Sequence, residues 1–325
     1  MSKDQILRVE DLVAYYKTEK GDVKAVDNVN FFLKPDEIVG IAGESGCGKS
    51  TLLNILYGFV EPPLKVLSGH VLMDVDGDEI DIIHKDKNEI EKLWWKHVSY
   101  IPQSSMGVLN PVIKIKDQFI EIFDKLDKNL TKNEFRRKVE ENLNVLGLPR
   151  AVLSSYPHQL SGGMRQRVVI AMSTILNPRI VYIDEPTTAL DVVVQRGILQ
   201  TITKFREQTK NTFVTVTHDM GVHYQITDRL IIMYAGKVVE ISETENIFKK
   251  PLNPYTLLLI ESLPKLGDRS ERKSIRGSPP SLLNPPKGCR FYPRCPYATR
   301  ECAEKEPPLT EIQRNHYISC FHPLR

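Results

Sequence analysis

A glycine-rich segment joins an apolar run, residues 37–42, to an apolar stretch that begins at Thr51: Gly43-Glu44-Ser45-Gly46-Cys47-Gly48-Lys49-Ser50. It fits G-x-x-x-x-G-K-[ST], the phosphate-binding loop that lies between a strand and a helix. Glycines let consecutive backbone N–H groups turn inward around an anion, and the following helix adds its positive N-terminal end. An ordinary glycine-rich turn explains the pattern less well, because its four fixed positions match by chance in about one such chain in a hundred. The sequence therefore predicts nucleotide binding here.

Residues suited to phosphate chemistry also occur at the end of a later apolar strand. In the loop itself, Lys49 is placed to neutralise the β- and γ-phosphates, and the Ser50 hydroxyl to ligate Mg²⁺. The apolar run 180–183 leads to Asp184, which would hold Mg²⁺ or its water, and to Glu185, which can polarise attacking water as a general base. Acidic loops are common, so this pair alone is weak evidence for phosphate chemistry. It becomes strong evidence because a phosphate loop precedes it in the chain.

A second pair of glycines opens a later predicted helix. Ser161 is a natural N-cap, and Gly162 and Gly163 leave the first N–H groups of the helix open to an anion. A helix start that merely packs would explain Ser161 but not the double glycine. Together with the helix after Gly48, the chain carries two anion-binding helix starts. Both can serve one nucleotide only if they face it from opposite sides.

Length and charge set limits on the function. The chain has 325 residues, 41% hydrophobic and 26% charged, with a formal net charge of +3. This composition is typical of a globular protein of more than one domain, and the charge is too small to indicate a nucleic-acid partner. No apolar run approaches the about 18 residues that span a bilayer, and the first residues lack a signal-peptide pattern. We therefore expect a cytosolic protein whose membrane role comes through a partner.

Hydrophobic patterning indicates strands and helices that alternate on either side of a helical block. Strands are expected at residues 6–9, 29–33, 37–42, 69–74, 98–101, 180–183, 212–216, 229–234 and 237–241. Apolar residues recur at helical spacing between 104 and 158, where Thr131 and Glu134 form a capping box. Further helices are expected at 163–176 and 192–208. Residues 251–325 hold 12 of the 21 prolines and predict a loop-rich appendage that needs a staple.

With these features the chain resembles the ATP-binding subunits of ABC transporters over about residues 5–260. The loop is similar to the Walker A motif of that family, Ile180 to Glu185 to its Walker B motif, and Leu160 to Gln166 to its signature motif. The signature motif binds the γ-phosphate held by a partner subunit. Met164 stands where the commonest signature has Gln, but Gln166 follows two places later. No catalytic position is lost, so the resemblance implies an intact ATP site.

The resemblance also implies individual roles. Tyr16 takes the adenine-stacking place, whereas by itself a Tyr on a strand end is more often a packing residue. Gln103 corresponds to the glutamine that senses Mg²⁺ and the membrane partner, Ala189-Leu190-Asp191 to the D-loop, and His218 to the switch histidine at the γ-phosphate. Glu185 and His218 are thus the expected catalytic residues, and Ser50, Gln103 and Asp184 the Mg²⁺ ligands. The expected nucleotide contacts are Tyr16, Gly43, Glu44, Ser45, Gly46, Cys47, Gly48, Lys49, Ser50, Thr51, Gln103, Ser161, Gly162, Gly163, Gln166 and Asp191.

The fold class implied is α/β. We expect a P-loop, RecA-like ATP-binding core at residues 1–103 and 159–250 with an antiparallel β subdomain. An α-helical subdomain is inserted at 104–158, although the same helices could belong to the core itself. A small loop-rich C-terminal domain, residues 251–325, carries a four-cysteine metal site.

Four of the five cysteines lie in the last 37 residues, at Cys289, Cys295, Cys302 and Cys320. In a reducing cytosol, a group of four nearby cysteines indicates a metal centre rather than disulfides. The spacing C-x5-C-x6-C-x17-C lacks the C-x2-C pair usual for zinc, but four thiolates can hold either Zn²⁺ or an iron–sulfur cluster. Cys47 lies far from this group in sequence and is not an expected ligand.

The tail resembles the oligopeptide/dipeptide importer ATPases in Pro254-Tyr255-Thr256 and in the segment 288–296. That resemblance favours a [4Fe–4S] cluster, with Zn²⁺, disulfides or free thiols as alternatives. The cluster would be a structural staple, or else a redox or iron sensor. His316 and His322 flank the last cysteine and are expected to be exposed, although either could replace a ligand.

The function implied is ATP hydrolysis that drives a solute importer, with di- or oligopeptide as the default cargo and oligosaccharide or nickel as alternatives. The expected partners are a second ABC ATPase subunit (a paralogue or a second copy), transmembrane permease subunits and an extracellular solute-binding protein, and no nucleic acid. The expected location is the cytoplasmic face of the cell membrane. Two other classes compete: a soluble ABC ATPase of DNA repair or translation, and a module that binds nucleotide without turnover. The first usually carries coiled-coil insertions or a duplicated cassette, which are absent here, and intact Glu185 and His218 argue against the second.

Overall fold

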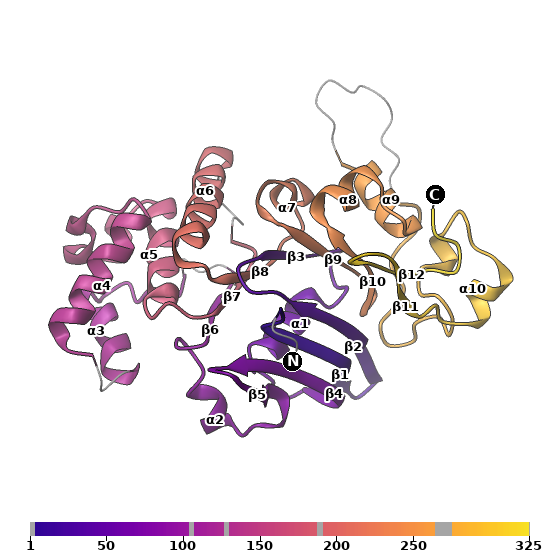
Figure 1. Cartoon of the computed structure of the whole chain (residues 1–325), viewed down its shortest axis with the longest axis horizontal. Coiled ribbons are helices and arrows are strands. Elements are labelled where there is room, and N and C mark those ends of the chain that lie inside the picture. Colours follow the sequence, from indigo (N-terminus) through magenta and orange to yellow (C-terminus); the bar gives the residue numbers. More distant parts are fainter. Residues whose placement is uncertain (1–3, 104–106, 127–129, 187–190, 264–274, 325) are drawn as a thin grey trace. The chain divides into compact units, whose positions relative to one another are not determined.

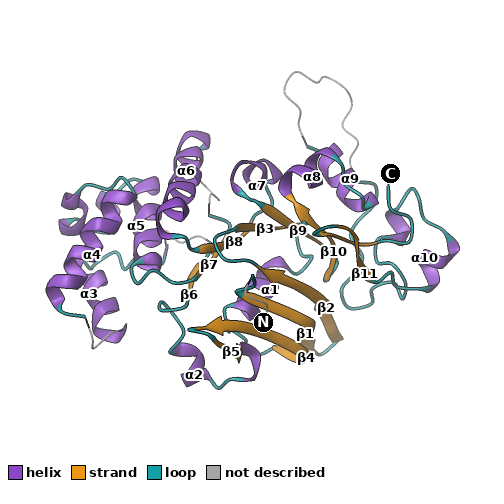
Figure 2. Cartoon of the chain, viewed as in Figure 1, coloured by secondary structure: helices purple, strands orange, loops and turns teal. Residues whose placement is uncertain are grey.

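The computed structural model describes residues 4–103, 107–126, 130–186, 191–263 and 275–324. Contacts divide the chain into two compact units. The first unit contains residues 1–85 and 216–325, and the second unit contains residues 86–215. Figure 1 labels the helices and strands of both units, and Figure 2 distinguishes helix, strand and loop. The three-part domain organisation with boundaries at 104, 159 and 251 stays a prediction.

An antiparallel four-stranded sheet forms the N-terminal part of the first unit. Its strand order is β2-β1-β4-β5, and its strands are β1 (Leu7–Thr18), β2 (Gly21–Leu33), β4 (Leu64–Val75) and β5 (Asp78–Asp81). Along β1 buried side chains alternate with partly exposed ones, as on a sheet with one face packed and one face in water. Strands β1 and β2 both extend beyond the expected ranges 6–9 and 29–33. Tyr16 therefore lies within β1, where it pairs with Val23 of β2.

A second sheet region of the first unit contains the strand that enters the phosphate loop. Here β3 (Ile38–Ala42) runs parallel to β9 (Arg229–Tyr234), and β9 pairs antiparallel with β10 (Lys237–Glu243). All five residues of β3 are buried, as a strand covered on both faces should be. The hairpin expected around Ala235-Gly236 is confirmed: both residues have positive φ, 47° and 84°, which a two-residue turn of the favoured hand requires.

The C-terminal residues extend this sheet. Strand β12 (His316–Ser319) pairs with β10, and β11 (Leu309–Gln313) pairs with β12. The sequence predicted a loop-rich appendage here and missed this pairing, which joins residues about 76 positions apart. The remaining elements of the first unit are α1 (Lys49–Leu56), η1 (Ile82–His84), α7 (Met220–Ile226), α8 (Thr244–Lys249), α9 (Pro254–Glu261), η5 (Tyr292–Arg294) and α10 (Arg300–Glu304).

The second unit combines helices with the strand order β8-β7-β6. Its elements are α2 (Lys87–Glu91), β6 (Val98–Ile101), α3 (Ile115–Leu126), α4 (Lys132–Val145), η3 (Arg150–Ser154), η4 (Pro157–Gln159), α5 (Gly162–Thr174), β7 (Ile180–Asp184), α6 (Val192–Thr209) and β8 (Thr212–Val216). Strands β6 and β7 are parallel. The capping box of α4 is confirmed, since Thr131 and Glu134 satisfy each other's backbone N–H groups. Both units therefore have the α/β character expected from the sequence.

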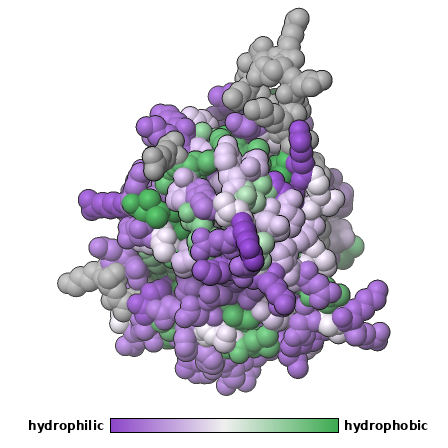
Figure 3. Space-filling view, turned by 90° about the vertical axis from the view of Figure 1, so that its right-hand side faces the viewer, coloured by the Kyte–Doolittle hydropathy of each residue, from purple (hydrophilic) through white to green (hydrophobic). Residues whose placement is uncertain are grey.

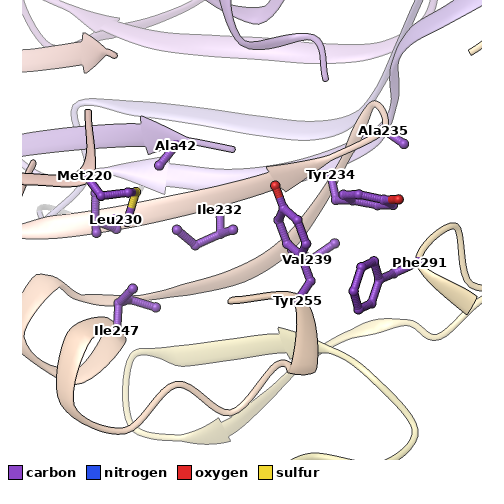
Figure 4. Close-up of a cluster of buried hydrophobic side chains, with 10 residues drawn as sticks. All are labelled: Ala42, Met220, Leu230, Ile232, Tyr234, Ala235, Val239, Ile247, Tyr255 and Phe291. Atoms are coloured by element: carbon purple, nitrogen blue, oxygen red, sulfur yellow. The ribbon is translucent and has the colours of Figure 1, made fainter. Parts of the chain in front are cut away.

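A buried cluster ties the C-terminal residues to the phosphate-loop sheet of the first unit (Figure 4). Three aromatic rings lie at its end: Tyr234 from β9, Tyr255 from α9 and Phe291 from the cysteine-rich tail. Their centroids are 4.6, 5.2 and 5.3 Å apart, within the range of favourable aromatic packing. This cluster fixes the tail next to the end of β9.

Candidate functional site

The phosphate loop occupies the turn from β3 to α1. Gly43, Gly46 and Gly48 have φ values of 149°, 76° and 106°, which L-residues with a side chain rarely adopt. A Cβ on Gly43 would collide with the carbonyl oxygen of Met233, and a Cβ on Gly48 with that of Ala25. Both glycines are therefore required by conformation and by space, as a loop that turns its N–H groups toward an anion demands.

The loop also holds its lysine in place. The side chain of Lys49 is buried, and its Nζ donates to the carbonyl oxygens of Gly43 and Glu44 at 2.8 and 3.0 Å. Ser50 follows in the first turn of α1 and is exposed. Glycines that allow the loop N–H groups to turn inward, an ammonium group within the loop and an exposed serine after it are the donor set that a Mg²⁺-bound triphosphate needs. The residues present therefore fit ATP and Mg²⁺.

Two other expected nucleotide residues lie beside the loop in the first unit. The hydroxyl groups of Tyr16 in β1 and Thr51 in α1 are 3.1 Å apart, so β1 brings the predicted adenine-stacking residue to the start of α1. His218 is exposed in the turn after β8, directly before Asp219, which caps α7 through the N–H groups of Gly221 and Val222.

Cys47 is packed within the loop rather than presented to a ligand. Its side chain is buried, and burial raises the pKa of its thiol. Its carbonyl oxygen accepts the N–H of Gly236 at 2.8 Å, so the β9–β10 turn supports the phosphate loop at this point.

The Walker B residues lie at the end of β7 in the second unit. Asp184 is buried, and its Oδ2 accepts the Tyr100 hydroxyl at 3.3 Å. Glu185 has φ of 49°, an unfavourable conformation for a non-glycine residue that is concentrated at functional sites. Its Oε2 accepts a hydrogen bond from Gln103 Nε2 at 2.9 Å. Two predicted site residues 82 positions apart are thus brought together because β6 and β7 are neighbours.

The signature glycines begin α5 of the second unit. The exposed Ser161 is the N-cap, as predicted, and its hydroxyl accepts the N–H of Met164 at 3.3 Å. A Cβ on Gly163 would lie 2.7 Å from a methyl group of Val194 in α6. Close packing of α5 on α6 is therefore one reason for this glycine, while Gly162 starts the helix. Gln166, in contrast, is buried.

Asp191 has a local structural role in addition to the one that the resemblance implies. It is the N-cap of α6, and its Oδ1 accepts the N–H of Val194 at 2.9 Å. Ala189 and Leu190, the other D-loop residues, lie outside the described residues.

One histidine near the phosphate-loop strand was not found from the sequence. His223 in α7 is fully buried, its Nε2 lies 3.3 Å from the carbonyl oxygen of Thr217, and a Cβ on Gly40 of β3 would overlap its ring. Burial lowers the pKa of His223 to about 4. No local pattern identifies it, because histidine is intermediate in burial and a single histidine does not mark a buried position.

His223 predicts a loss of stability in acid. Its folded pKa lies below the unfolded value, so the unfolded chain binds more protons and stability falls as the pH decreases below about 6.5. We expect the free energy of unfolding to fall by about 2 kcal/mol between pH 7.5 and pH 5 from this group. Urea titrations should show a smaller pH difference for His223→Gln than for wild type. The exposed His158→Gln variant is the control, and equal pH differences in both variants would contradict this assignment.

The four C-terminal cysteines line one cavity of about 40 Å³ in the first unit. All four are free thiols in the structure. They therefore do not form the disulfides that the sequence left as an alternative to a metal centre. Burial raises the pKa of Cys289 and Cys320 to about 11. Chain folding thus gathers the four thiols, as predicted, in surroundings that disfavour thiolates unless a cation compensates them.

The two tail histidines differ from each other. The expectation that His316 is exposed is wrong: it is buried, and its Nε2 lies 2.7 Å from an Oε1 of Glu240 in β10. The pairing of β12 with β10 places it there. His322 lines the cysteine cavity, and its Nε2 lies 2.9 Å from the Thr299 hydroxyl.

Among the described residues, no helix has both the length and the apolar character needed to cross a bilayer. The face of the molecule shown in Figure 3 is mostly hydrophilic, with apolar residues in separate small patches.

Two family models match the chain. That of the ABC transporter family matches residues 26–188, and that of the oligopeptide/dipeptide transporter C-terminal region matches residues 239–302. Among solved structures, the dimeric ATP-binding cassette MJ0796 bound to ADP and Pi is 30% identical, with a TM-score of 0.63 over 74% of this chain and 99% of that chain. The cbiO1 protein of Clostridium perfringens is 26% identical, with a TM-score of 0.65 over 76% of this chain and 92% of that chain.

Full-length relatives are also found. The dipeptide transport ATP-binding protein DppD of Caldanaerobacter subterraneus subsp. tengcongensis is 39% identical over 317 residues, which is 97% of this chain and 96% of the relative. The oligopeptide transport ATP-binding protein OppD of Escherichia coli is 37% identical over 324 residues, 99% and 94% of the two chains. The family and fold class predicted from the motifs are thereby confirmed. This chain belongs to the ATP-binding subunits of the ABC transporter family, in the group with an oligopeptide/dipeptide transporter C-terminal region, and it is an ATPase.

Proposed function

We propose that this protein is the ATP-hydrolysing subunit of an ABC importer for di- or oligopeptides. The observation that carries the proposal is the coexistence of a phosphate loop fit for Mg²⁺ and ATP with a C-terminal region of the peptide-transporter type. The names of the dipeptide and oligopeptide transport relatives support peptide as the cargo class. Energy from ATP would be delivered to a permease that crosses the membrane.

Each site residue has a proposed task. The loop residues 43–51 hold the phosphates, with Lys49 as the counter-charge, and Tyr16 stacks on adenine. Ser50, Gln103 and Asp184 would supply oxygen ligands to Mg²⁺, which would neutralise part of the phosphate charge. The remaining task is water activation, which Glu185 performs as general base while His218 contacts the γ-phosphate. The hydrogen bond from Gln103 to Glu185 supports this assignment, because it holds the carboxylate at the end of β7.

The signature residues Ser161, Gly162, Gly163 and Gln166, with Asp191, would complete the site of a second subunit. Two subunits then sandwich two ATP molecules head to tail, so that binding closes the dimer and hydrolysis reopens it. The helical subdomain 104–158, next to Gln103 in sequence, would pass this motion to the permease. The partner is a paralogue or a second copy of this chain, located with it at the cytoplasmic face of the membrane, and an extracellular solute-binding protein delivers the peptide.

The four-cysteine cavity is proposed to hold a [4Fe–4S] cluster, with Zn²⁺ as the alternative. All four cysteines line this one cavity, and four thiolates are a donor set for either group. The resemblance of the tail to the oligopeptide/dipeptide importer ATPases favours the cluster. When bound, a cluster would cross-link the ligands Cys289, Cys295, Cys302 and Cys320 and stabilise a tail with a small core of its own.

Iron content tests this assignment. Anaerobically purified protein should contain about four iron atoms per chain, and Cys302→Ser should lose most of them because one ligand is missing. Cys47→Ser is the matched control and should keep its iron. One zinc and no iron in wild type would contradict the cluster.

The melting temperature distinguishes a structural role of the cluster from a sensor role. If the cluster is a structural staple, Cys302→Ser also lowers Tm. A variant with unchanged Tm that loses only redox-dependent activity would support a sensor.

Uptake measurements in cells test the cargo class. A strain without this chain should take up labelled dipeptide at a rate restored by wild type but not by Lys49→Ala, which lacks the phosphate counter-charge. Uptake of labelled oligosaccharide or nickel should not depend on the chain. If uptake of oligosaccharide or of nickel requires this chain while peptide uptake does not, that solute replaces peptide as the assigned cargo. Unaltered uptake of all three would favour a soluble ABC ATPase unrelated to transport.

A further inference from the structure

The cysteine-rich tail reaches the phosphate loop through a single arginine of the first unit. Arg294 ends η5 and directly precedes Cys295. Its Nη1 and Nη2 donate to the two carboxylate oxygens of Glu44 at 2.6 and 2.9 Å. Planar two-point pairing of this kind is the strongest ion-pair geometry available to arginine.

Other contacts fix this arginine so that it can act on the loop. Its side chain is only 5% exposed, against 23% for Glu44. The guanidinium also donates to the Tyr234 hydroxyl at 3.1 Å and to the carbonyl oxygen of Arg276 at 2.9 Å, and it lies over the Phe291 ring. An arginine held at several points loses little additional freedom when it binds a carboxylate. It therefore determines where Glu44 lies.

A second contact holds the backbone of the same loop residue. The N–H of Glu44 donates to the hydroxyl of Tyr255 at 2.9 Å, and the Tyr255 ring packs on Tyr234 and Phe291. Side chain and backbone of Glu44 are thus both bound by residues C-terminal to position 250. Glu44 is the first residue after Gly43 in a loop that accepts a polyanion, so its charge opposes phosphate binding unless a cation neutralises it.

We propose that Arg294 is a positioning residue for ATP: it neutralises Glu44 and sets the first turn of the phosphate loop, so that the cysteine-rich tail is part of the nucleotide site. This inference rests on the proposed ATP site at residues 43–51. One consequence is that a change in the tail reaches the phosphate loop directly, since Arg294 and Cys295 are adjacent.

Nucleotide affinity of the full-length protein tests the proposal. Arg294→Ala should raise the Kd for Mg·ATP about tenfold, the size expected when a charged hydrogen-bonded pair is lost. Adding Glu44→Gln should recover most of that loss, because the second change removes the unneutralised charge. KM should rise with little change in kcat. Arg300→Ala, which removes a 92% exposed arginine of α10, is the control and should bind as wild type does.

Two results would overturn the proposal. Wild-type affinity in Arg294→Ala would show that the loop does not need the arginine. A loss that Glu44→Gln does not relieve would show that Arg294 acts through folding of the tail, and circular dichroism and Tm of each variant would reveal this. Failure of wild type itself to bind Mg·ATP would instead refute the proposed function.

A separate cluster on the antiparallel sheet of the first unit has metal-ligand geometry. The Nδ1 atoms of His70 in β4 and His84 in η1 lie 2.6 and 2.7 Å from the same oxygen, Oδ2 of Asp81. The three ligand atoms lie within 4.8 Å of one another. Their convergence follows from the register of the β4–β5 hairpin, in which Asp81 pairs with Leu72, so that His70 and Asp81 face the same side of the sheet.

We infer that His70, Asp81 and His84 form a surface site for a divalent transition ion such as Zn²⁺. Two imidazoles and one carboxylate are a donor set that suits Zn²⁺, Cu²⁺ and Ni²⁺. Ligands at about 2.0–2.1 Å in a tetrahedron lie about 3.4 Å apart, so the present contacts need to open by less than an ångström. The other oxygen of Asp81 accepts the N–H of Val71 at 3.2 Å and orients the carboxylate, as an outer-shell partner does.

Imidazole ¹H–¹⁵N spectra test this site without interference from the cysteines, whose thiols give no signal there. Zn²⁺ at micromolar concentration should shift the Nδ1 resonances of His70 and His84 together, and Asp81→Asn should weaken binding at least tenfold. His158, an exposed histidine of the second unit, is the internal control. Shifts of His70 and His84 only in the concentration range that also shifts His158 would overturn the assignment.

Discussion

Glu185→Gln is expected to lower the steady-state rate of ATP hydrolysis by about 10²- to 10⁴-fold, the contribution typical of a general base. Glutamine has the same shape as glutamate but cannot take a proton from water. ATP affinity should stay within about twofold of wild type, because Glu185 does not belong to the phosphate loop. The variant should also accumulate as an ATP-bound dimer, since closure precedes hydrolysis. Phosphate release and size-exclusion chromatography with Mg·ATP measure the two effects.

Glu207→Gln is the matched control, because it makes the same chemical change at an exposed position of α6. It should hydrolyse ATP at the wild-type rate and show no trapped dimer. Undiminished turnover in Glu185→Gln would refute the role of Glu185 as general base. The hydrogen bond from Gln103 to Glu185 at 2.9 Å would then be a structural link between β6 and β7.

Ser161→Arg is expected to abolish hydrolysis while leaving the phosphate loop of its own chain able to bind ATP. The signature helix would contact nucleotide only on the opposing subunit, where a bulky cation at its N-terminus blocks the close approach of helix and γ-phosphate. Mg·ATP affinity of the separate chain should therefore change less than about twofold, whereas Lys49→Ala loses most of it. Calorimetry on separate chains and hydrolysis by assembled dimers measure the two properties.

Mixing the two defective chains distinguishes a shared site from a self-contained one. A dimer of one Ser161→Arg subunit and one Lys49→Ala subunit has one complete site, made of the intact loop of the first and the intact signature of the second. If a paralogue is the natural partner, one protein carries the signature-serine change and the other carries the change of the phosphate-loop lysine. Recovery of hydrolysis is expected in the mixture, relative to either variant alone. Normal activity of Ser161→Arg in every combination would argue against a shared site.

The sequence is sufficient to predict the local backbone structure around the candidate site, while the roles of its residues stay predictions. The glycines of the phosphate loop, the N-cap Ser161 and the pair Asp184-Glu185 were predicted because strand, turn and helix signals are adjacent in the chain. The fold class followed from the same signals together with the ABC transporter resemblance. Element ends are less predictable, as β1 shows: the sequence predicts a strand only at residues 6–9. The observed strand continues to Thr18 beyond a bulge near Asp11, whose φ is 44°.

Contacts between distant residues were not predictable from local pattern. The ion pair of Arg294 with Glu44 joins positions 250 apart, and the pairing of β12 with β10 buries His316 on Glu240. Such contacts depend on which strands become neighbours, and hydrophobic periodicity does not encode this. The proline-rich composition of residues 251–325 predicts that the tail needs a staple, but it does not indicate that the same segment contacts the phosphate loop.

Transport by a reconstituted complex tests the central claim most directly. Proteoliposomes that contain the permease, the partner ATPase and this chain should take up labelled dipeptide when supplied with the peptide-loaded binding protein and Mg·ATP. Uptake should require hydrolysis, so vesicles with Glu185→Gln should bind ATP and transport almost nothing, while Glu207→Gln vesicles transport at the wild-type rate. Equal dipeptide accumulation with Glu185→Gln and wild type, or ATP hydrolysis by wild type that peptide does not stimulate, would contradict the account.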